Sequence, residues 1–317
     1  MNKREIGNLI YYERTRQNIG LSELASGVCS VSVLQRLENG ERLPEPLILE
    51  RLVERLGKSM NKMELLYHKT SYDIYYLREA VECYVEEQQY EEAAEALIFY
   101  ESLLKGKEAL HWQYICKMRA VLAVEQEGDH GKAAMLLEEA MGKTLPGFDL
   151  NSLDSYLLGE SELLLLLMWI QEKIDEDVTH IGIDGNRLLR YIQQTCQDEE
   201  VLANVYSKAA WVLGNVELKG HNPREALWYT LEGQKRLADA LDIDQKTVSR
   251  LEGGKYKPKQ GTFQKIKEYL EIHRDICSTR LVVEDFALLE MEREIARKKY
   301  YKPELFTEQQ GQLLKSA

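Results

Sequence analysis

Three polar side chains near residue 250 have the types and spacing of base-reading residues. Gln245, Lys246 and Arg250 lie at positions i, i+1 and i+5 of the segment QKTVSRLE. A glutamine amide can form two hydrogen bonds with adenine, and lysine or arginine can bind O6 and N7 of guanine. A helix that presents such side chains on one face is typical of major-groove recognition. These residues therefore predict contact with DNA bases, provided that the neighbouring elements hold this face outward.

The residues around this segment predict a helix-turn-helix unit. Leu237 lies in a preceding helix, and Asp242 follows at a turn, where aspartate tolerates a left-handed backbone better than most residues. Asp244 is placed to cap the next helix, and Val248 gives that helix a buried side. The unit has no separate first helix, because the segment PREALWYTLEG must serve both this unit and the helices before it.

A similar device stands at the N-terminus with its full set of helices. Ile6 and Ile10 give the first helix an apolar face, SELASGV predicts the second helix, and SVSVLQRLENG predicts the recognition helix. Gly20 stands where a serine or threonine cap is usual, which is a small loss of stability. The segment EPLILERLVERLG closes the domain, so the fold of this copy is predicted to be sound.

The polar candidates of the N-terminal copy are fewer. Val31 and Val33 occupy the positions that hold Gln245 and Thr247 in the other copy, and valine reads little beyond a thymine methyl group. Base readout is therefore expected to be weaker here. This copy is still predicted to be the surer DNA contact, because it has all its helices and lies at a free end. Its predicted DNA contacts are Ser30, Ser32, Gln35, Arg36 and Arg42.

Both devices resemble the Xre-type (lambda-repressor-like) helix-turn-helix family. In the second copy the resemblance covers Gln234, Leu237, Ala238, Gln245, Thr247, Val248, Ser249, Arg250, Glu252, Gly254 and Pro258. It implies that Gln234 touches phosphate and that Glu252 is structural. Three lysines after the recognition helix are expected to meet phosphate as well. The predicted DNA contacts of this copy are Gln234, Gln245, Lys246, Thr247, Arg250, Lys255, Lys257 and Lys259.

The middle of the chain predicts a stack of helix pairs. Helical spacing of apolar residues recurs at 73–88, 90–104, 108–127 and 130–141, and again near 160–174, 185–196, 199–218 and 223–241. Three helices begin alike, with QYEEAAEAL, DHGKAAMLL and HNPREALWY. This pattern resembles a degenerate tetratricopeptide array over roughly residues 70 to 235. A generic helical bundle is the alternative.

The net charge of −12 is unevenly distributed along the chain. Residues 60–234 carry 15 basic and 31 acidic residues, whereas residues 1–59 carry nine and eight, and residues 235–275 carry ten and seven. Each predicted DNA-binding device thus lies in a mildly basic segment, and local charge sets the field that a phosphate backbone meets. The acidic middle favours a basic or neutral ligand.

One helix of the array offers a candidate ligand site. Within 201–220, Asn204, Lys208, Trp211 and Asn215 form a stripe that lies about 110° round the helix from its apolar stripe. The two asparagines could clamp a peptide main chain, because an amide both donates and accepts hydrogen bonds. An inter-helix or solvated face is the alternative.

Other classes of protein fit the sequence poorly. The six histidines show neither HxxxH nor HExxH spacing, the five cysteines never show CxxC spacing, and no glycine-rich phosphate loop follows a strand. We therefore expect no catalytic site, no metal and no cofactor. The longest apolar run, LLLLLMWI, is too short to span a membrane, and the N-terminus is charged from the start. These features predict a cytoplasmic protein.

Together these features predict an all-α protein in four parts. Residues 1–65 form an N-terminal Xre-type helix-turn-helix domain, 66–232 a TPR-like helical repeat array, 233–275 a second Xre-type helix-turn-helix, and 276–317 a C-terminal helix and tail. An Xre-type domain followed by such an array resembles the Rgg/PlcR-like peptide-pheromone regulators of Gram-positive bacteria, especially at GVCSVSVLQRLENG.

The resemblance implies a transcription regulator that binds double-stranded DNA and is controlled by a short peptide in the array. We expect a homodimer, formed through the repeats or through a tail helix at 281–299. An intramolecular pairing of the two devices is the alternative to the dimer. A helical-repeat protein-interaction scaffold with vestigial helix-turn-helix modules is the alternative function.

Overall fold

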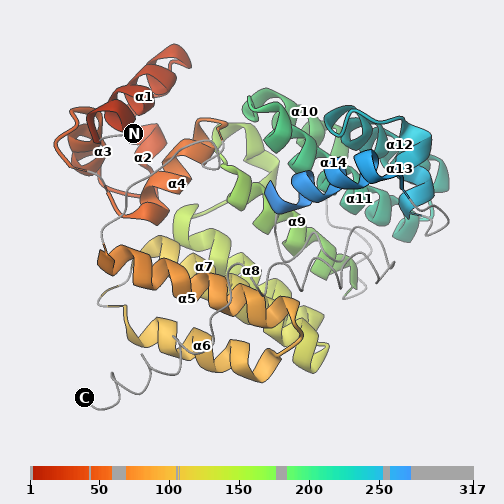
Figure 1. The fold of residues 1–317 in the computed structure, drawn as a ribbon, viewed down its shortest axis with the longest axis horizontal. Helices are drawn as coiled ribbons and strands as arrows, with labels where there is room; N and C mark the ends of the chain where they lie inside the picture. Colours follow the sequence, from red (N-terminus) through yellow and green to blue (C-terminus); the bar gives the residue numbers. More distant parts are fainter. Residues whose placement is uncertain are drawn as a thin grey trace.

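The computed structural model describes residues 3–42, 44–58, 69–104, 106, 108–175, 184–252 and 258–272. Within these ranges the regular structure is helical and contains no β-strand, so the all-α prediction is confirmed (Figure 1). None of the helices in these ranges is long and apolar enough to cross a bilayer. The predicted tail helix at 281–299, Lys255 and Lys257 lie outside the described residues.

The first four helices form the N-terminal helix-turn-helix unit. They are α1 (Lys3–Arg16), α2 (Leu21–Ala25), α3 (Val31–Glu38) and α4 (Pro46–Arg55). Their apolar faces meet in a separate core, as the sequence predicted, because each helix carries leucine or isoleucine at helical spacing. The fully buried side chains of this core include Ile6, Ile10, Leu24, Leu34, Leu37, Leu52 and Leu56.

Helix α1 lies close against α3. A Cβ atom at Gly7 would stand 2.1 Å from the Leu37 carbonyl oxygen, so only glycine allows this approach. The Arg14 guanidinium completes the contact, because its Nε and Nη2 donate to the two carboxylate oxygens of Glu38 at 2.6 and 2.9 Å. Its Nη1 donates to the Ile19 carbonyl oxygen at 2.9 Å. This two-point ion pair fixes the orientation of α3 relative to α1.

The repeat array follows as successive helices that pack in pairs. Helix α5 packs on α6, α7 on α8, and α11 on α12, while α9 packs on both α8 and α11. Ala93 and Ala133, at the starts of α6 and α8, have no exposed surface, as expected where two helices cross closely. The helices are α5 (Lys69–Glu86), α6 (Tyr90–Ser102), α7 (Ala109–Leu122), α8 (His130–Thr144), α9 (Glu160–Asp175), α10 (Gly185–Thr195), α11 (Glu199–Lys219) and α12 (Pro223–Ala240). Helix α7 continues as a π-helical turn, η2 (Ala123–Glu127), and a 3₁₀ segment, η3 (Leu150–Ser155), precedes α9.

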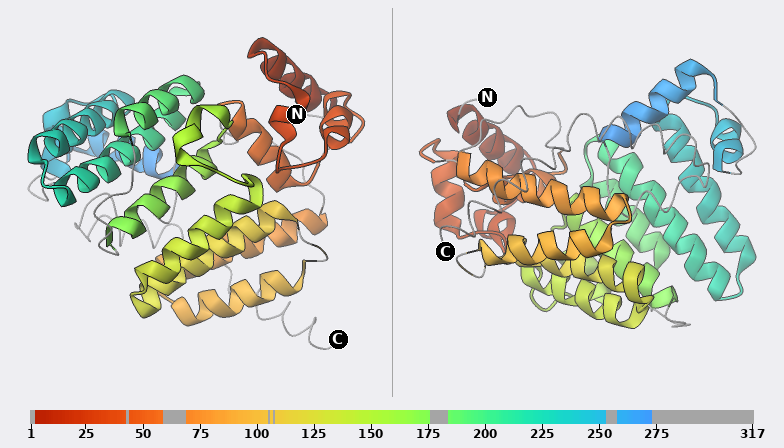
Figure 2. Two further views of the ribbon diagram at one scale, coloured as in Figure 1. Left: turned by 180° about the vertical axis from the view of Figure 1, so that it is seen from behind. Right: turned by 60° about the horizontal axis from the view of Figure 1, so that its bottom comes forward.

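The second helix-turn-helix unit shares a helix with the array. Its elements are the C-terminal half of α12, then α13 (Gln245–Glu252) and α14 (Gln260–Ile272). Asp242 has a φ of 48°, which confirms the predicted left-handed turn. Among the described residues of this unit, the buried hydrophobic side chains are Ala238, Leu241 and Val248, so its core is much smaller than the N-terminal one. The views in Figures 1 and 2 place the two units on opposite sides of the molecule.

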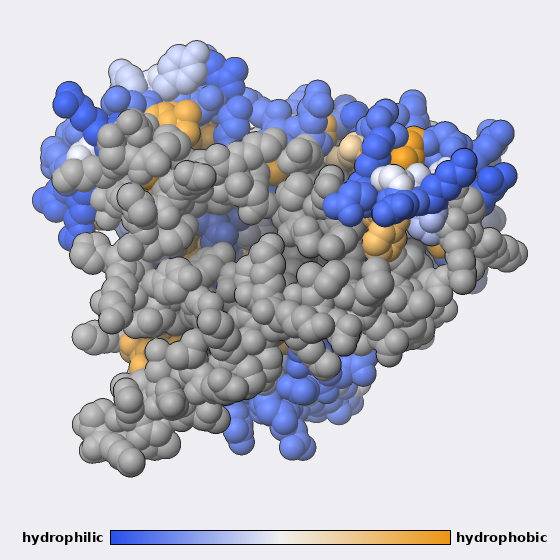
Figure 3. All heavy atoms as spheres, viewed as in Figure 1, coloured by the Kyte–Doolittle hydropathy of each residue, from blue (hydrophilic) through white to orange (hydrophobic). Residues whose placement is uncertain are grey.

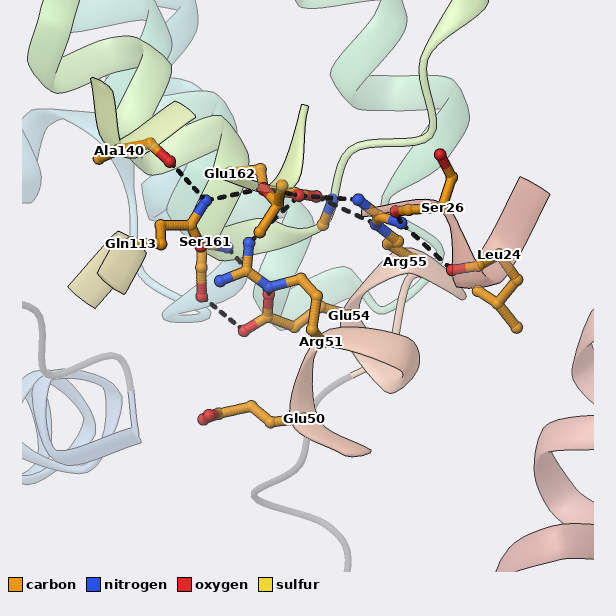
Figure 4. Close-up of polar contacts among 12 residues, drawn as sticks. Leu24, Ser26, Glu50, Arg51, Glu54, Arg55, Gln113, Ala140, Ser161 and Glu162 are labelled. Carbon is orange, nitrogen blue, oxygen red and sulfur yellow. Dashed lines mark hydrogen bonds and ion pairs between the residues drawn. The ribbon is translucent and has the colours of Figure 1, made fainter. Parts of the chain in front are cut away.

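A buried ionic network joins the N-terminal unit to the array (Figure 4). Glu162, in α9, has a fully buried side chain, and Arg55 of α4 donates to its two oxygens at 3.2 and 2.9 Å. Arg51, one turn earlier in α4, lies 3.4 Å from the same carboxylate. Thr144 and the Gly159 backbone N–H also donate to Glu162, at 2.7 and 2.9 Å. The carboxylate is therefore surrounded by donors from three elements.

The network extends on both sides of Glu162. Arg55 Nη1 donates to the Leu24 and Ser26 carbonyl oxygens at 3.2 and 2.6 Å, which ties the end of α2 to α9. Glu54 accepts from the Ser161 hydroxyl at 2.7 Å and pairs with Arg51 at 3.2 Å. Burial opposes ionisation of Glu162, but Arg51 and Arg55 outweigh it and hold the pKa of Glu162 below its ordinary value. Burial raises the pKa of Glu54, although Arg51 opposes that shift.

A second contact anchors the unit at the junction of α10 and α11. Gly57 has a φ of 69°, and a Cβ there would stand 2.5 Å from the Thr195 carbonyl oxygen. The Asp198 backbone N–H donates to the Gly57 carbonyl oxygen at 3.0 Å, and Arg16 donates to the Gln197 side chain at 2.7 Å. The N-terminal unit is thus held against the array at this junction as well as through the ionic network around Glu162.

Replacement of Glu162 by glutamine should destabilise the fold at neutral pH. Loss of one partner from a buried ion pair costs about 3–5 kcal/mol, because Arg51 and Arg55 lose their shared counter-charge. The lowered pKa of Glu162 means that its contribution is full above the unfolded-state value near ~4.3 and is lost as the pH falls through the folded-state value. Urea unfolding at several pH values should therefore show a gap between wild type and Glu162→Gln that narrows in acid.

The matched control is Glu101→Gln, which removes an exposed ion pair with Arg119 whose atoms lie 2.6 Å apart. An exposed pair contributes about 0–1 kcal/mol, so this variant should unfold almost like wild type. Equal losses for the two variants would contradict the role assigned to the network.

Candidate nucleic-acid interface

Helix α3 presents one exposed stripe of the N-terminal unit. Val31, Ser32, Gln35 and Arg36 are exposed, while Leu34 and Leu37 on the opposite side are fully buried. The exposed positions follow i, i+1, i+4 and i+5, so they share one face of the helix. None of the four forms an ion pair within the described part of the chain, and Arg36 is available to a guanine or a phosphate. Arg42, just beyond the helix, is also exposed.

The beginning of α3 is held by Ser30. Its side-chain oxygen accepts from the Val33 backbone N–H at 3.3 Å, and it lies 3.0 Å from the Ser32 hydroxyl. Ser30 therefore acts as the N-cap of α3. Its hydroxyl proton is not needed for the cap and can be donated to a DNA phosphate. The cap fixes where the exposed stripe begins.

The acidic residue at the end of α3 does not oppose phosphate, because Arg14 neutralises it. The bidentate pair uses both oxygens of Glu38, and that hydrogen bonding raises the pKa of Arg14 despite some burial. Two charges that compensate each other within the unit leave Arg36 as the unpaired charge on this face.

In the second unit, two of the predicted base readers are exposed on α13. Lys246 and Arg250 are exposed, and neither forms an ion pair with the described residues. Lys259, before α14, is also exposed and could meet phosphate. These three cations are the accessible DNA candidates of this unit.

The other predicted contacts of the second unit are engaged within it. Gln245 Nε2 donates to the Leu231 carbonyl oxygen at 3.0 Å, which ties α13 to α12. The Thr247 hydroxyl donates to Asp244 at 2.6 Å, and Asp244 also accepts from the Lys246 backbone N–H at 3.1 Å, which confirms the predicted cap. These bonds engage one amide N–H of Gln245 and the hydroxyl proton of Thr247 within the unit.

Glu252 shows how the two units differ. It occupies the position of Glu38, but no arginine of the described ranges pairs with it; it accepts a hydrogen bond from Gln234 Nε2 at 2.5 Å. Burial raises the pKa of Glu252, and the hydrogen bond from Gln234 only partly opposes this shift. Gln234, predicted to touch phosphate, therefore serves an internal contact here. The missing first helix explains the difference, because α1 supplies Arg14 in the N-terminal unit.

The predicted ligand stripe of α11 lies mostly inside the array. Asn204 is only 4% exposed and donates to Glu160 at 2.8 Å, and Asn215 donates to Gln171 at 3.1 Å. Lys208 is buried as well, whereas Trp211 is 36% exposed. The stripe thus connects α11 with α9, and its accessible part is the indole together with Asn215.

Sequence patterns did not reveal the residues that fasten the unit to the array. Arg51 and Arg55 lie one turn apart in α4, and such pairs on a short helix usually face solvent. A clue was present in Glu162, which directly precedes the apolar run LLLLLMWI of a buried helix. Its partners could not be identified from that clue alone.

The fold and the exposed stripe of α3 define a helix-turn-helix DNA-binding protein with a body of helical repeats. The helix-turn-helix family model matches residues 10–63 and again residues 234–276. The match confirms that both predicted devices are helix-turn-helix segments, and it includes the α12–α14 unit despite the shared helix. No curated protein matches the sequence.

Two solved structures are similar to the chain over most of its length. The crystal structure of PlcR from Bacillus thuringiensis, in complex with the peptide PapR7 and DNA, has 15% sequence identity and a TM-score of 0.43. The alignment covers 89% of this chain and 100% of that chain. The apo form of the competence regulator ComR from Streptococcus vestibularis has 14% identity and a TM-score of 0.31, with 94% and 98% covered. Both likenesses are weak, so the DNA-binding assignment rests on the helix-turn-helix match and the geometry of α3.

Replacement of Arg36 by alanine should relax the sequence preference at one base pair. A good bidentate contact contributes about 1–3 kcal/mol of discrimination, and Arg36 is the unpaired cation on the exposed stripe of α3. Selection of binding sites from a random DNA pool at fixed salt would measure this change. Arg224→Ala, at the exposed start of α12, is the control and should keep the wild-type preference. A uniform loss of affinity without altered preference would assign Arg36 to phosphate instead.

Proposed function

We propose that the protein is a cytoplasmic, sequence-specific DNA-binding transcription regulator without enzymatic activity, and that α3 makes the principal DNA contact. The observation that carries the proposal is the exposed stripe Ser32–Gln35–Arg36 on a helix-turn-helix unit whose core is complete. The family match to residues 10–63 supports it. The second unit is the auxiliary contact, because among its described residues the exposed cations predicted to bind DNA are Lys246, Arg250 and Lys259.

A comparison of two multiple variants tests this ranking in the full-length chain. Combined Ser32→Ala, Gln35→Ala and Arg36→Ala should abolish protection of a selected operator in footprinting. All three side chains are exposed, so the fold should survive. Combined Lys246→Ala and Arg250→Ala should weaken binding and reduce its salt dependence, but leave the footprint in place. A footprint lost only in the second variant would show that α13 is the principal contact.

The array supports a ligand-controlled regulator. Trp211 and Asn215 offer an exposed aromatic ring one turn from a side-chain amide, a combination that suits a short peptide main chain. The acidic excess of residues 60–234 favours a neutral or basic peptide. Because Asn204 and Lys208 are buried, they support this surface from behind rather than line it.

We further propose that the protein acts as a homodimer. Helix-turn-helix proteins commonly bind paired half-sites about 34 Å apart, or a multiple of that, and so present two recognition helices. The two units of one chain lie on opposite sides of the molecule, which favours pairing between two chains (Figure 2). Much of the described surface in Figure 3 is hydrophilic, with small separate apolar patches.

Helix α12 carries the strongest candidate for a self-association face. Leu227, Trp228 and Leu231 are 59%, 43% and 46% exposed, and they share one face at helical spacing. A cluster of exposed large apolar side chains marks interaction surfaces more often than chance exposure does. The same cluster would also serve the alternative function, a scaffold that binds another protein.

Combined Leu227→Glu and Leu231→Glu should therefore convert a dimer to a monomer. Light scattering at micromolar concentration would measure the mass of each variant. Ile98→Glu is the control, because Ile98 is 65% exposed on α6 and lies away from α12. A wild-type monomer, or a dimer that survives the α12 changes, would contradict dimerisation through this face. A monomer that still protects two half-sites would favour pairing of the two units within one chain.

A further inference from the structure

A histidine and two glutamates converge where α4 meets α7. His111 lies in the first turn of α7 and is 1% exposed, and Glu108 is the N-cap of the same helix. Glu45 is the N-cap of α4, 66 residues before His111 in the chain. His111 Nε2 lies 2.6 Å from Glu45 Oε1 and 3.6 Å from Glu108 Oε2. The fold thus brings one imidazole nitrogen and two carboxylates from two domains together.

We infer that Glu45, Glu108 and His111 form a binding site for a divalent transition-metal ion of the Zn²⁺ type. One donor atom from each residue lies within 4.8 Å of the others. Zinc binds nitrogen and oxygen at about 2.0–2.2 Å, so tetrahedral donors stand about 3.3–3.5 Å apart. The distances of 2.6 and 3.6 Å bracket that separation, and small side-chain rotations would suffice.

The rest of the imidazole ring is held as in a metal site. His111 Nδ1 lies 2.5 Å from the hydroxyl of Tyr100, a fully buried residue. A hydrogen bond from Nδ1–H to the Tyr100 oxygen would fix the ring and leave Nε2 as the coordinating nitrogen, just as metal-bound histidines use their second ring N–H to hold the ring in place. Tyr100 stays neutral beside the carboxylates because burial raises its pKa.

The charge and the exposure of the cluster also suit a cation. Two carboxylates face one imidazole, which leaves negative charge that a divalent ion would compensate. Glu108 and His111 follow the Glu-x-x-His spacing by which one helix supplies two ligands to a metal. Glu108 has a side chain that is 52% exposed, so an ion and a water molecule can enter from this side.

The array contains another histidine–glutamate pair, which lacks a third ligand among the described residues and so serves as a comparison for the proposed site. His130 Nδ1 lies 2.7 Å from Glu172 Oε2. Within the described ranges, the residues around Glu45 form the only group of three ligands with metal-binding separation. A metal at this group would connect the N-terminal unit to the array, a property that goes beyond the proposed DNA binding and does not depend on it.

Zinc binding to the full-length protein tests the inference. After treatment with a chelator, equilibrium dialysis against Zn²⁺ should yield one tightly bound ion per chain. Glu108→Gln, an exposed change that should not disturb folding, should lower the affinity at least tenfold, and His111→Gln should abolish binding. His130→Gln is the matched control and should bind like wild type. Zn²⁺ should raise the melting temperature of wild type and of the control, but not that of His111→Gln.

Three results would overturn the inference. One is the absence of stoichiometric Zn²⁺ binding by a protein with wild-type circular dichroism. Another is binding that Glu108→Gln and Glu45→Gln both leave unchanged. The third is a Co²⁺ derivative with a sulfur-to-metal charge-transfer band, which would place the ion at a cysteine such as Cys29 or Cys83.

Discussion

The placement of the DNA-binding helix depends on one buried carboxylate. Glu162 has no access to solvent, and an isolated charge there would be unstable unless Arg51 and Arg55 remained beside it. Since the arginines belong to α4 and the glutamate to α9, the requirement holds the N-terminal unit and the array together. Arg55 also donates hydrogen bonds to the carbonyl oxygens at the end of α2, the helix that precedes α3, so the same side chain holds this part of the unit to α9. The array therefore determines where α3 stands.

The two helix-turn-helix units differ in the origin of their first helix and in the partner of the glutamate that ends the recognition helix. The N-terminal unit owns its first helix, and α1 supplies Arg14, which neutralises Glu38 and fixes α3. The second unit takes its first helix from the array, and the partner of Glu252 within the described residues is the amide of Gln234. The better set of base-reading residue types thus lies on the less complete fold. This division supports different roles for the two units rather than a simple duplication of function.

Much of the architecture could be predicted because it depends on local patterns. The spacing of apolar residues predicted α9 to α12 to within one residue at each end and α5 to α8 to within five, and Asp242 was expected at a left-handed turn. Other features depend on which helix faces meet. From the sequence, Arg51 and Arg55 resemble surface residues, but in the structure α9 covers them. Gln245 resembles a base-reading residue, but its side-chain amide donates a hydrogen bond to the Leu231 carbonyl oxygen. Glu45 and His111 are 66 residues apart, so no motif could unite them. Helical periodicity specifies faces, but not the partners of those faces.

The buried network has a consequence for how the molecule opens. Many multidomain proteins release one domain at a time, each with its own free energy of local unfolding. Here, separation of α4 from α9 would leave Glu162 facing Thr144 and Gly159 without a counter-charge. The amide protons of α3 should consequently exchange with solvent through the same cooperative opening as those of α9. We therefore expect the N-terminal unit to unfold cooperatively with the array and not as an independent domain.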